Sequence, residues 1–330
     1  MNFCTLFDSY YLHKGIALYL SLERVSHNFH LYVMAFDQNS YNKLKSFGFE
    51  HMTVELLDDF ETPELKAVKP SRNKAEYCWT AGPSVIYHFL TKYELGKITY
   101  LDSDLFFLSN PEIIELEAGR SSVVITEQGI GEKAAERYGR YCVQYMTFRN
   151  DEDGLGALTW WKDRCIEWCF QIMEPTRYAD QKYLDEFPKK WSNVCVLKNL
   201  GAGIAPWNML KYDYTEDSLM YNGEKWPLVF FHMHGVIVSV KDGILTAHSH
   251  HFALNKDVIH LFFEPYAALM AEVSNKYLGQ TVMSFRVKDM NLFKKIEYRV
   301  RAWVKNNQLL TNFYFKHFKK KEVGHGTLIG

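Results

Sequence analysis

Two aspartates separated by one serine stand between two apolar runs of this chain. Asp102-Ser103-Asp104 follows the β-branched and aromatic run 98–101, which has the composition of a buried parallel strand, and precedes the apolar run 105–108. Carboxylates in such a setting are costly to bury unless something pairs them. At the carboxyl end of a strand in an open α/β sheet they would lie where ligands bind. Their hard oxygens suit Mg²⁺ or Mn²⁺ shared with phosphates, and the alternative is a solvent-facing pair that caps a helix.

Histidines provide a second set of candidate metal ligands. His232-Met233-His234-Gly235 ends the apolar run 228–231, which predicts a strand. A strand-end histidine beside two carboxylates makes a mixed oxygen and nitrogen site, which Mn²⁺ accepts more readily than Ca²⁺ does. Strand alternation puts both histidines on one face, so His234 competes with His232 for this role. For either side chain the alternative is a hydrogen-bonded structural role.

The N-terminal segment predicts a nucleotide-binding β-α-β unit. Residues 3–7 have strand composition, 12–25 have a helical apolar face with Asp8 or Ser9 as the expected N-cap, and a second strand-like run follows. A right-handed crossover would bring the loop 7–11 to the carboxyl edge of the sheet, near the aspartates. No Gly-x-Gly-x-x-Gly follows the first strand, which argues against a dinucleotide dehydrogenase.

Other segments predict a diphosphate contact, a mobile loop and a core helix. Arg72 and Lys74 precede a predicted helix at 80–93 and could contact a diphosphate; we favour Lys74, and the alternative for both is a solvated side chain. The Gly-rich, charged stretch 128–139 predicts a mobile loop over the site. The tryptophan-rich stretch 158–173 predicts a helix of the core rather than a sugar platform.

The composition is that of a globular protein. Hydrophobic residues make up 47% of the 330 residues, which excludes disorder of the whole chain, and the net charge of −1 indicates no particular partner. The six cysteines are scattered, as expected for reduced and mostly buried thiols. The sequence begins without a signal-peptide pattern, and no apolar run has the length of a membrane span. We therefore expect a cytoplasmic protein.

The C-terminal part of the chain is basic. Residues 286–321 hold eleven lysines and arginines against two acids, interleaved with aromatic side chains. This pattern is typical of peripheral contact with an anionic membrane surface, here the inner face of the cytoplasmic membrane. The alternatives are a nucleic-acid contact, for which no recognition module is present, and a solvated tail. We expect no nucleic-acid partner.

The octapeptide Tyr-Leu-Asp-Ser-Asp-Leu-Phe-Phe at 100–107 resembles the metal and nucleotide-sugar motif of GT-A glycosyltransferases, especially the retaining family 8-like bacterial enzymes. Asp8 and Tyr11 match the Asp-x-x-Tyr with which those enzymes hold the base. His232 matches the metal ligand of their His-x-x-Gly motif. The resemblance runs as an ordered series of motifs over residues 3–241.

A further segment, Asp180-Gln181-x-x-Leu184, is similar to the family segment that lies beside the acceptor or the donor sugar. The alternative for Asp180 is a helix N-cap. The resemblance implies metal ligation by Asp102, Asp104 and His232, cofactor binding by Thr5, Asp8, Tyr11, Lys74, Asp102 and Ser103, and catalytic roles for Asp180 and Gln181. The implied metal cofactor is Mn²⁺ or Mg²⁺.

The fold that the resemblance implies is α/β, with a GT-A (Rossmann-like), mixed and mostly parallel sheet flanked by helices. Residues 1–255 would form the catalytic domain, with a nucleotide-binding half at about 1–110 and an acceptor half at about 111–255. Residues 256–330 would form a helical, basic C-terminal extension.

The implied activity is metal-dependent transfer of a sugar from a nucleoside diphosphate donor, a UDP-sugar, to a glycan or lipid-linked acceptor in surface polysaccharide or lipopolysaccharide synthesis, with the anomeric configuration retained. Two features depart from the family: Cys142-Val143-Gln144 replaces an Asn-x-Gly, and a Lys-Pro-Trp is missing. Gln144 could still supply an amide to the sugar. The alternatives are an inactive sugar- or lipid-binding protein on the same scaffold and a nucleotidyltransferase.

Overall fold

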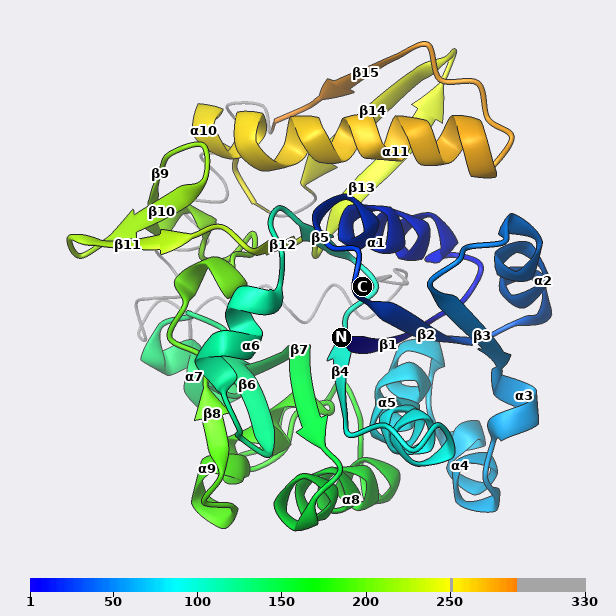
Figure 1. Ribbon diagram of the computed structural model, residues 1–330, viewed down its shortest axis with the longest axis vertical. Helices are drawn as coiled ribbons and strands as arrows, with labels where there is room; N and C mark the ends of the chain where they lie inside the picture. The colour runs from blue at the N-terminus through cyan, green and yellow to red at the C-terminus, as the bar shows by residue number, and fades with distance from the viewer. Residues whose placement is uncertain (250–251, 290–330) are drawn as a thin grey trace, which may run out of the picture. The chain divides into compact units, whose positions relative to one another are not determined.

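The computed structural model describes residues 1–249 and 252–289 (Figure 1). Most of the basic segment 286–321 lies outside the described residues, so its expected membrane contact stays a prediction.

The chain divides into two compact units. The first comprises Met1–His234 and Glu272–Thr281, and the second comprises the described residues of Gly235–Ala271 and those from Val282 to Asp289. The expected domain boundary near residue 255 stays a prediction.

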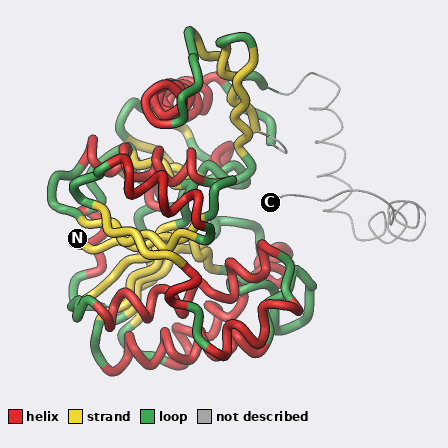
Figure 2. The backbone as a smooth tube through the Cα atoms, turned by 90° about the vertical axis from the view of Figure 1, so that its right-hand side faces the viewer, coloured by secondary structure: helices red, strands yellow, loops and turns green. Residues whose placement is uncertain are grey.

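A seven-stranded mixed sheet forms the centre of the first unit, with helices on both of its faces (Figure 2). Its strands are β1 (Asn2–Phe7), β2 (His30–Ala35), β3 (Met52–Leu56), β4 (Lys97–Leu101), β6 (Val123–Glu127), β7 (Tyr141–Arg149) and β8 (Val194–Val196). The order is β3-β2-β1-β4-β7-β6-β8. The first four strands are parallel, β7 is antiparallel to both of its neighbours, and β8 is parallel to β6. The predicted fold class is confirmed.

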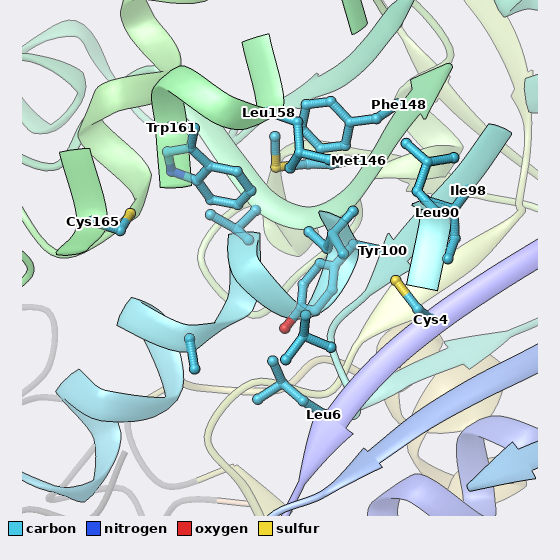
Figure 3. Packing of buried hydrophobic residues seen from close by; sticks show 14 of the residues in the cluster. Cys4, Leu6, Leu90, Ile98, Tyr100, Met146, Phe148, Leu158, Trp161 and Cys165 are labelled. Atoms are coloured by element: carbon cyan, nitrogen blue, oxygen red, sulfur yellow. The ribbon is translucent and has the colours of Figure 1, made fainter. Parts of the chain in front are cut away.

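Strand alternation decides which helical layer each buried side chain faces. Cys4 and Leu6 of β1 belong to a hydrophobic cluster that includes buried residues of α5 (Lys74–Lys92) and α8 (Glu152–Glu167), as Figure 3 shows. Thr5 lies between them in sequence and therefore faces the opposite side of the sheet. Helices α5 and α8 thus cover one face of the sheet.

The tryptophan-rich helix belongs to the core, as predicted. Trp161 is fully buried in the same cluster (Figure 3). The helix begins at Glu152 rather than at residue 158, because the Asp151 carboxylate caps it by accepting a hydrogen bond from the Gly154 amide at 2.9 Å.

The predicted caps of α1 (Leu12–Val25) are wrong. Its N-cap is Tyr11, which makes no side-chain cap hydrogen bond, rather than Asp8 or Ser9. The Asp8 carboxylate instead accepts hydrogen bonds from the amides of Tyr10 and Tyr11 at 2.9 and 3.1 Å. Asp8 therefore shapes the loop between β1 and α1 without capping the helix.

The start of α5 also differs from the predicted one at residue 80. The Glu76 amide donates to the Asn73 side chain at 3.0 Å, and the Asn73 amide donates to the Glu76 carboxylate at 2.9 Å. This capping box starts the helix at Lys74, so Lys74 occupies its first turn.

The stretch predicted as a mobile loop contains a helix, α7 (Glu132–Tyr138). Its carboxyl end is held by its neighbours: the Gln181 side-chain amide donates to the Tyr138 carbonyl at 2.9 Å, and Lys182 donates to the Arg137 carbonyl at 3.3 Å. A lysine at this end also complements the helix dipole.

The remaining elements of the first unit are short. Strand β5 (Leu105–Phe107) pairs with β12 (Phe230–His232), and a second small sheet contains β9 (Asp213–Tyr214), β10 (Ser218–Tyr221) and β11 (Glu224–Pro227). The helices are α2 (Gln38–Phe47), α3 (Leu57–Phe60), α4 (Pro63–Val68), α6 (Glu112–Ala118) and α9 (Phe187–Lys190). All six cysteines are free thiols.

The second unit contains a three-stranded sheet of β13 (Val236–Lys241), β14 (Ile244–Ser249) and β15 (Ser284–Val287). Its helical part runs through α10 (Lys256–Val258), a π-helical turn at Ile259–Phe263 and the first part of α11 (Glu264–Tyr277). Within residues 1–249 and 252–289, no helix combines the length and the apolar character needed to cross a bilayer.

Candidate active site

The Asp-x-Asp motif follows β4 directly and is tied to two other segments through its backbone. The Asp102 amide donates to the Gln144 carbonyl of β7 at 3.0 Å, and the Asp104 carbonyl accepts from the Met233 amide at 2.8 Å. Asp104 is buried, with 7% of its surface exposed. The motif therefore lies between the central sheet and the end of β12.

Pairing of β5 with β12 brings His232 to the aspartates. In this antiparallel pair His232 stands opposite Leu105, the residue after Asp104. The Nε2 atom of His232 lies 3.0 Å from Asp104 Oδ1 and 3.5 Å from Asp102 Oδ2. Two residues that are far apart in the sequence, Asp104 and His232, thus form one buried cluster of charge.

The cluster has the donor set of a divalent metal site. Asp104, His232 and His234 each offer one ligand atom, and these atoms lie within 4.8 Å of one another. Asp102 lies beside them, so the three predicted metal ligands and the competing His234 meet in one place. A site with one or two carboxylates and imidazole nitrogens suits Mn²⁺ better than Ca²⁺. The residues present therefore fit a metal such as Mn²⁺.

Burial and mutual attraction shift the pKa values of this cluster. Burial alone would raise the pKa of Asp104, but Lys14 and His232 reverse the effect and hold it well below its usual range. Burial would lower the pKa of His232, but Asp104 and Asp102 hold it well above its usual value. Burial and the charge of Asp104, opposed by His232, raise the pKa of Asp102 to about 6. Without metal, His232 and Asp104 thus form an ion pair, and metal binding would release the histidine proton.

The side chain of Gln144 is hydrogen-bonded to His232 and is not available to a sugar. Its side chain is fully buried, and its Oε1 atom lies 2.8 Å from His232 Nδ1. Its Nε2 atom donates to the Thr126 hydroxyl at 3.3 Å. The expectation that Gln144 supplies an amide to the substrate is therefore wrong. Instead it orients the imidazole so that Nε2 faces the aspartates.

The loop after β1 joins the predicted base-binding and diphosphate-binding residues. Asp8 is buried and forms an ion pair with Lys74. Arg72 is directed elsewhere: its guanidinium carbon lies 3.8 Å from the centre of the Phe170 ring, and it donates to the Ile166 carbonyl at 3.2 Å. Of the two predicted cations, Lys74 is therefore the one beside the loop.

Lys14 is a site residue that sequence reasoning missed. Its Nζ atom lies 3.3 Å from Asp104 Oδ2, and both side chains are buried. The same Nζ atom lies 4.6 Å from the centre of the Tyr11 ring. Residues three apart at a helix start share a face, so the position of Lys14 relative to Tyr11 was a usable signal.

Asp180 stands at the N-cap position of a 3₁₀ helix, Gln181–Glu186, but its side chain makes no cap hydrogen bond. Asp180 is buried, and burial, reinforced by the charge of Asp102, raises its pKa to about 8. The Trp161 indole donates to the Asp180 carbonyl at 2.8 Å. Asp180 is thus close enough to Asp102 for the charge of that carboxylate to affect its pKa.

Thr5 and Ser103 have different surroundings. Thr5 is fully buried in β1, and its hydroxyl has no hydrogen-bond partner in the part of the chain that the structure describes. Ser103 is buried between the two aspartates. The predicted cofactor contacts of both residues stay predictions.

The glycine-rich loop 199–208 packs against the histidines. A Cβ atom at Gly201 would lie 1.8 Å from the Pro227 carbonyl oxygen, so the backbone of this loop approaches another segment of the chain closely. The centre of the Trp207 ring lies 5.5 Å from that of His232 and 5.5 Å from that of His234. Its indole donates to the Gln128 carbonyl at 2.8 Å, which fixes the ring in place.

Similarity to known proteins was found in sequence and in structure. No family model matches the sequence. The chain is 32% identical over 241 residues to the uncharacterized protein YfnD of Bacillus subtilis. The aligned region covers 71% of this chain and 77% of YfnD. It is 29% identical over 252 residues to the uncharacterized protein YfnF of Bacillus subtilis, covering 73% of this chain and 83% of YfnF.

Among solved structures, the chain is similar to the galactosyltransferase LgtC in complex with donor and acceptor sugar analogs. The TM-score is 0.48 and the identity 12%, over 82% of this chain and 96% of that one. It is also similar to the glycosyltransferase GlyE of Streptococcus pneumoniae, with a TM-score of 0.48 and 14% identity over 83% of this chain and 63% of that one. Both of these proteins are glycosyltransferases. At these scores neither protein's activity carries over to this chain.

Proposed function

We propose that this chain, which belongs to the family of the Bacillus subtilis protein YfnD, is a metal-dependent glycosyltransferase that uses a nucleoside diphosphate sugar. The observation that carries the proposal is the buried cluster of Asp104 and His232, with Asp102 and His234 beside it, at the carboxyl end of β4. Buried ionisable groups with strongly shifted pKa values cluster at functional sites.

Sugar transfer from a nucleoside diphosphate requires the site to neutralise the charge of the leaving diphosphate. A divalent ion held by Asp104, the histidines and Asp102 supplies Lewis-acid stabilisation of that charge when it is bound. Lys74 stands beside the loop after β1 and adds a second positive charge toward the phosphates once it leaves its ion pair with Asp8. Gln144 keeps the imidazole of His232 in its ligand orientation.

Recognition of the base is assigned to the loop after β1. We propose that Tyr11 stacks on uracil, that Asp8 bonds its edge, and that Thr5 and Ser103 complete the nucleotide contacts. The donor would then be a UDP-sugar.

Asp180 and Gln181 are assigned to the sugar side of the site. Because its pKa is raised to about 8, Asp180 is protonated near neutral pH in the absence of metal and can donate a hydrogen bond. The Gln181 amide already bonds the Tyr138 carbonyl, so Gln181 also links the site to α7. We propose that the anomeric configuration is retained, which the configuration of the product, read by NMR, would test.

The acceptor is proposed to be a glycan or a lipid-linked sugar of surface polysaccharide or lipopolysaccharide synthesis. The basic segment 286–321 would hold the protein on the inner face of the cytoplasmic membrane. Sedimentation with vesicles that contain anionic lipid tests this part.

A thermal-shift panel tests the active-site assignment. UDP, GDP, CDP and ADP are each added with Mn²⁺ or with EDTA to the wild type, to Asp104→Asn and to the control Asp163→Asn, whose side chain is 54% exposed. A nucleotide at about 100 times its Kd stabilises the folded state by about 2.7 kcal/mol. We expect this stabilisation from UDP, only with Mn²⁺, in the wild type and the control but not in Asp104→Asn.

Other outcomes of the panel select the alternatives. No shift with any nucleotide would contradict the active-site assignment and favour an inactive binding protein. If a UDP-sugar binds with Mn²⁺ but is neither transferred to an acceptor nor slowly hydrolysed, the result would also favour an inactive binding protein. Release of pyrophosphate from a nucleoside triphosphate would indicate a nucleotidyltransferase.

A further inference from the structure

We infer that Lys14 couples the binding of the divalent cation to the binding of the diphosphate. It neutralises Asp104 when neither ligand is bound, and it turns to the diphosphate when both are bound. The inference rests on the proposed function and adds to it a residue that the sequence motifs do not include.

The first observation is that both oxygens of Asp104 already have cationic or proton-donating neighbours. Lys14 Nζ lies 3.3 Å from Oδ2, and His232 Nε2 lies 3.0 Å from Oδ1. The side chains of Lys14 and Asp104 are each only 9% exposed. A buried ammonium needs such a counter-charge, because desolvation would otherwise be too costly.

This arrangement disfavours a metal ion that arrives alone. A divalent cation bound to Asp104 would lie close to the Lys14 ammonium, and two positive charges repel strongly where little water screens them. Lys14 therefore lowers the affinity of the site for the bare metal ion.

The second observation is that Lys14 also adjoins the loop assigned to the nucleotide. Its Nζ atom lies 4.6 Å from the centre of the Tyr11 ring, and the ion pair of Asp8 with Lys74 belongs to the same loop. A free nucleoside diphosphate, which is the leaving group of the proposed reaction, carries more negative charge than one divalent cation cancels. When the two bind together, the ammonium is attracted to the phosphates instead of being repelled by the metal.

The consequence is positive cooperativity between metal and diphosphate. Whatever factor the diphosphate adds to metal affinity, the metal adds to diphosphate affinity, because the coupling free energy is reciprocal. A device of this kind would keep the site from filling with metal before the diphosphate is present.

Calorimetric titrations test the inference. Mn²⁺ alone, the nucleoside diphosphate alone and each in the presence of the other are titrated into the wild type, Lys14→Met, Lys14→Arg and Lys45→Met. Methionine keeps the length of the side chain and removes the charge, arginine keeps the charge, and Lys45 is an exposed residue of α2 that controls for the loss of one lysine. The nucleotide is the one that stabilises the wild type in the thermal-shift panel.

We expect Lys14→Met to bind Mn²⁺ alone about tenfold more tightly than the wild type and to lose most of the coupling factor, while Lys14→Arg keeps it. Lys45→Met should match the wild type. Unchanged or weaker Mn²⁺ affinity in Lys14→Met, with wild-type coupling, would overturn the inference even if the melting temperature falls, because a purely structural lysine would behave in this way. If the wild type binds neither Mn²⁺ nor any nucleotide, the proposed function itself fails.

Discussion

Replacing Asp180 with asparagine is expected to remove a pH dependence from the stability of the metal-free protein. Burial, reinforced by the charge of Asp102, raises the pKa of the Asp180 carboxyl from 3.8 to about 8. In the unfolded chain the same group has a pKa of about 3.9. At pH values between these two pKa values, the Asp180 carboxyl is ionised in the unfolded chain and protonated in the folded protein. The free energy of unfolding therefore falls as pH rises through this interval.

The magnitude follows from the size of the shift. One proton changes the free energy of unfolding by about 1.4 kcal/mol per pH unit. A shift from 3.8 to about 8 is about four units, so ionisation of Asp180 removes up to about 5 kcal/mol by the upper end of the interval. This is a large part of the roughly 5–15 kcal/mol by which a folded domain is stable. Asparagine has nearly the same shape and no proton to lose.

Urea unfolding in EDTA, at pH values from about 5 to about 8, measures the effect. The wild type should lose stability relative to Asp180→Asn by about 1.4 kcal/mol for each pH unit. Asp163→Asn, which removes an exposed carboxylate from α8, controls for the change in net charge. Parallel curves for the wild type and Asp180→Asn would refute the reasoning, because the carboxyl would then be ionised in the folded protein and its burial would not control its proton.

Two further predictions concern residues that build the site. Gly201→Ala places a Cβ atom 1.8 Å from the Pro227 carbonyl oxygen and should lower the free energy of unfolding by about 1–3 kcal/mol or more. The control Gly96→Ala adds a Cβ atom that meets nothing within 4 Å and should leave the stability unchanged. Equal urea midpoints for the two variants would disprove this packing. Gln144→Leu removes the partner of His232 Nδ1 and should weaken Mn²⁺ binding about 10–100-fold in calorimetry, and unchanged affinity would show that His232 is oriented by other contacts.

The elements around the aspartates could be predicted because each has a strong local signal. The run 98–101 is short and apolar, and the structure places it in β4. The helix predicted at 12–25 matches α1, since its apolar positions are buried against the sheet. A motif at the end of a strand then needs only the general rule that open sheets bind ligands at their carboxyl edge.

Helix starts were less predictable, although one signal was available. Asn73 and Glu76 have the spacing of a capping box, and this pair, rather than the apolar pattern from residue 80, begins α5. The helix α7 (Glu132–Tyr138) was hidden because its glycine-rich flanks and charged composition resemble a loop. What holds it is the bond from Gln181, which is distant in sequence and has no local signature.

The partners of the buried charges could not be deduced from composition at all. In the sequence, Lys14 resembles an ordinary polar residue in the first turn of a helix. Only the fold shows that it pairs with Asp104. Gln144 reads as a candidate substrate contact, and only the neighbouring strand shows that it is bound to His232. In each case the second residue comes from a different element, so the interaction depends on how the elements pack.

The register of β5 against β12 is the physical link between the motif and its histidine. Phe107, Phe106 and Leu105 pair in turn with Phe230, Phe231 and His232, and the backbone bond from Met233 to Asp104 extends this ladder by one step. Because side chains alternate along a strand, a slip of one residue would turn His232 to the opposite face and bring a fully buried phenylalanine of β12 toward the carboxylates. Burial of those phenylalanines therefore specifies the register. The same hydrophobic packing that stabilises this small sheet thus sets the distance between Asp104 and His232, which is why the two motifs form one site although neither predicts the other.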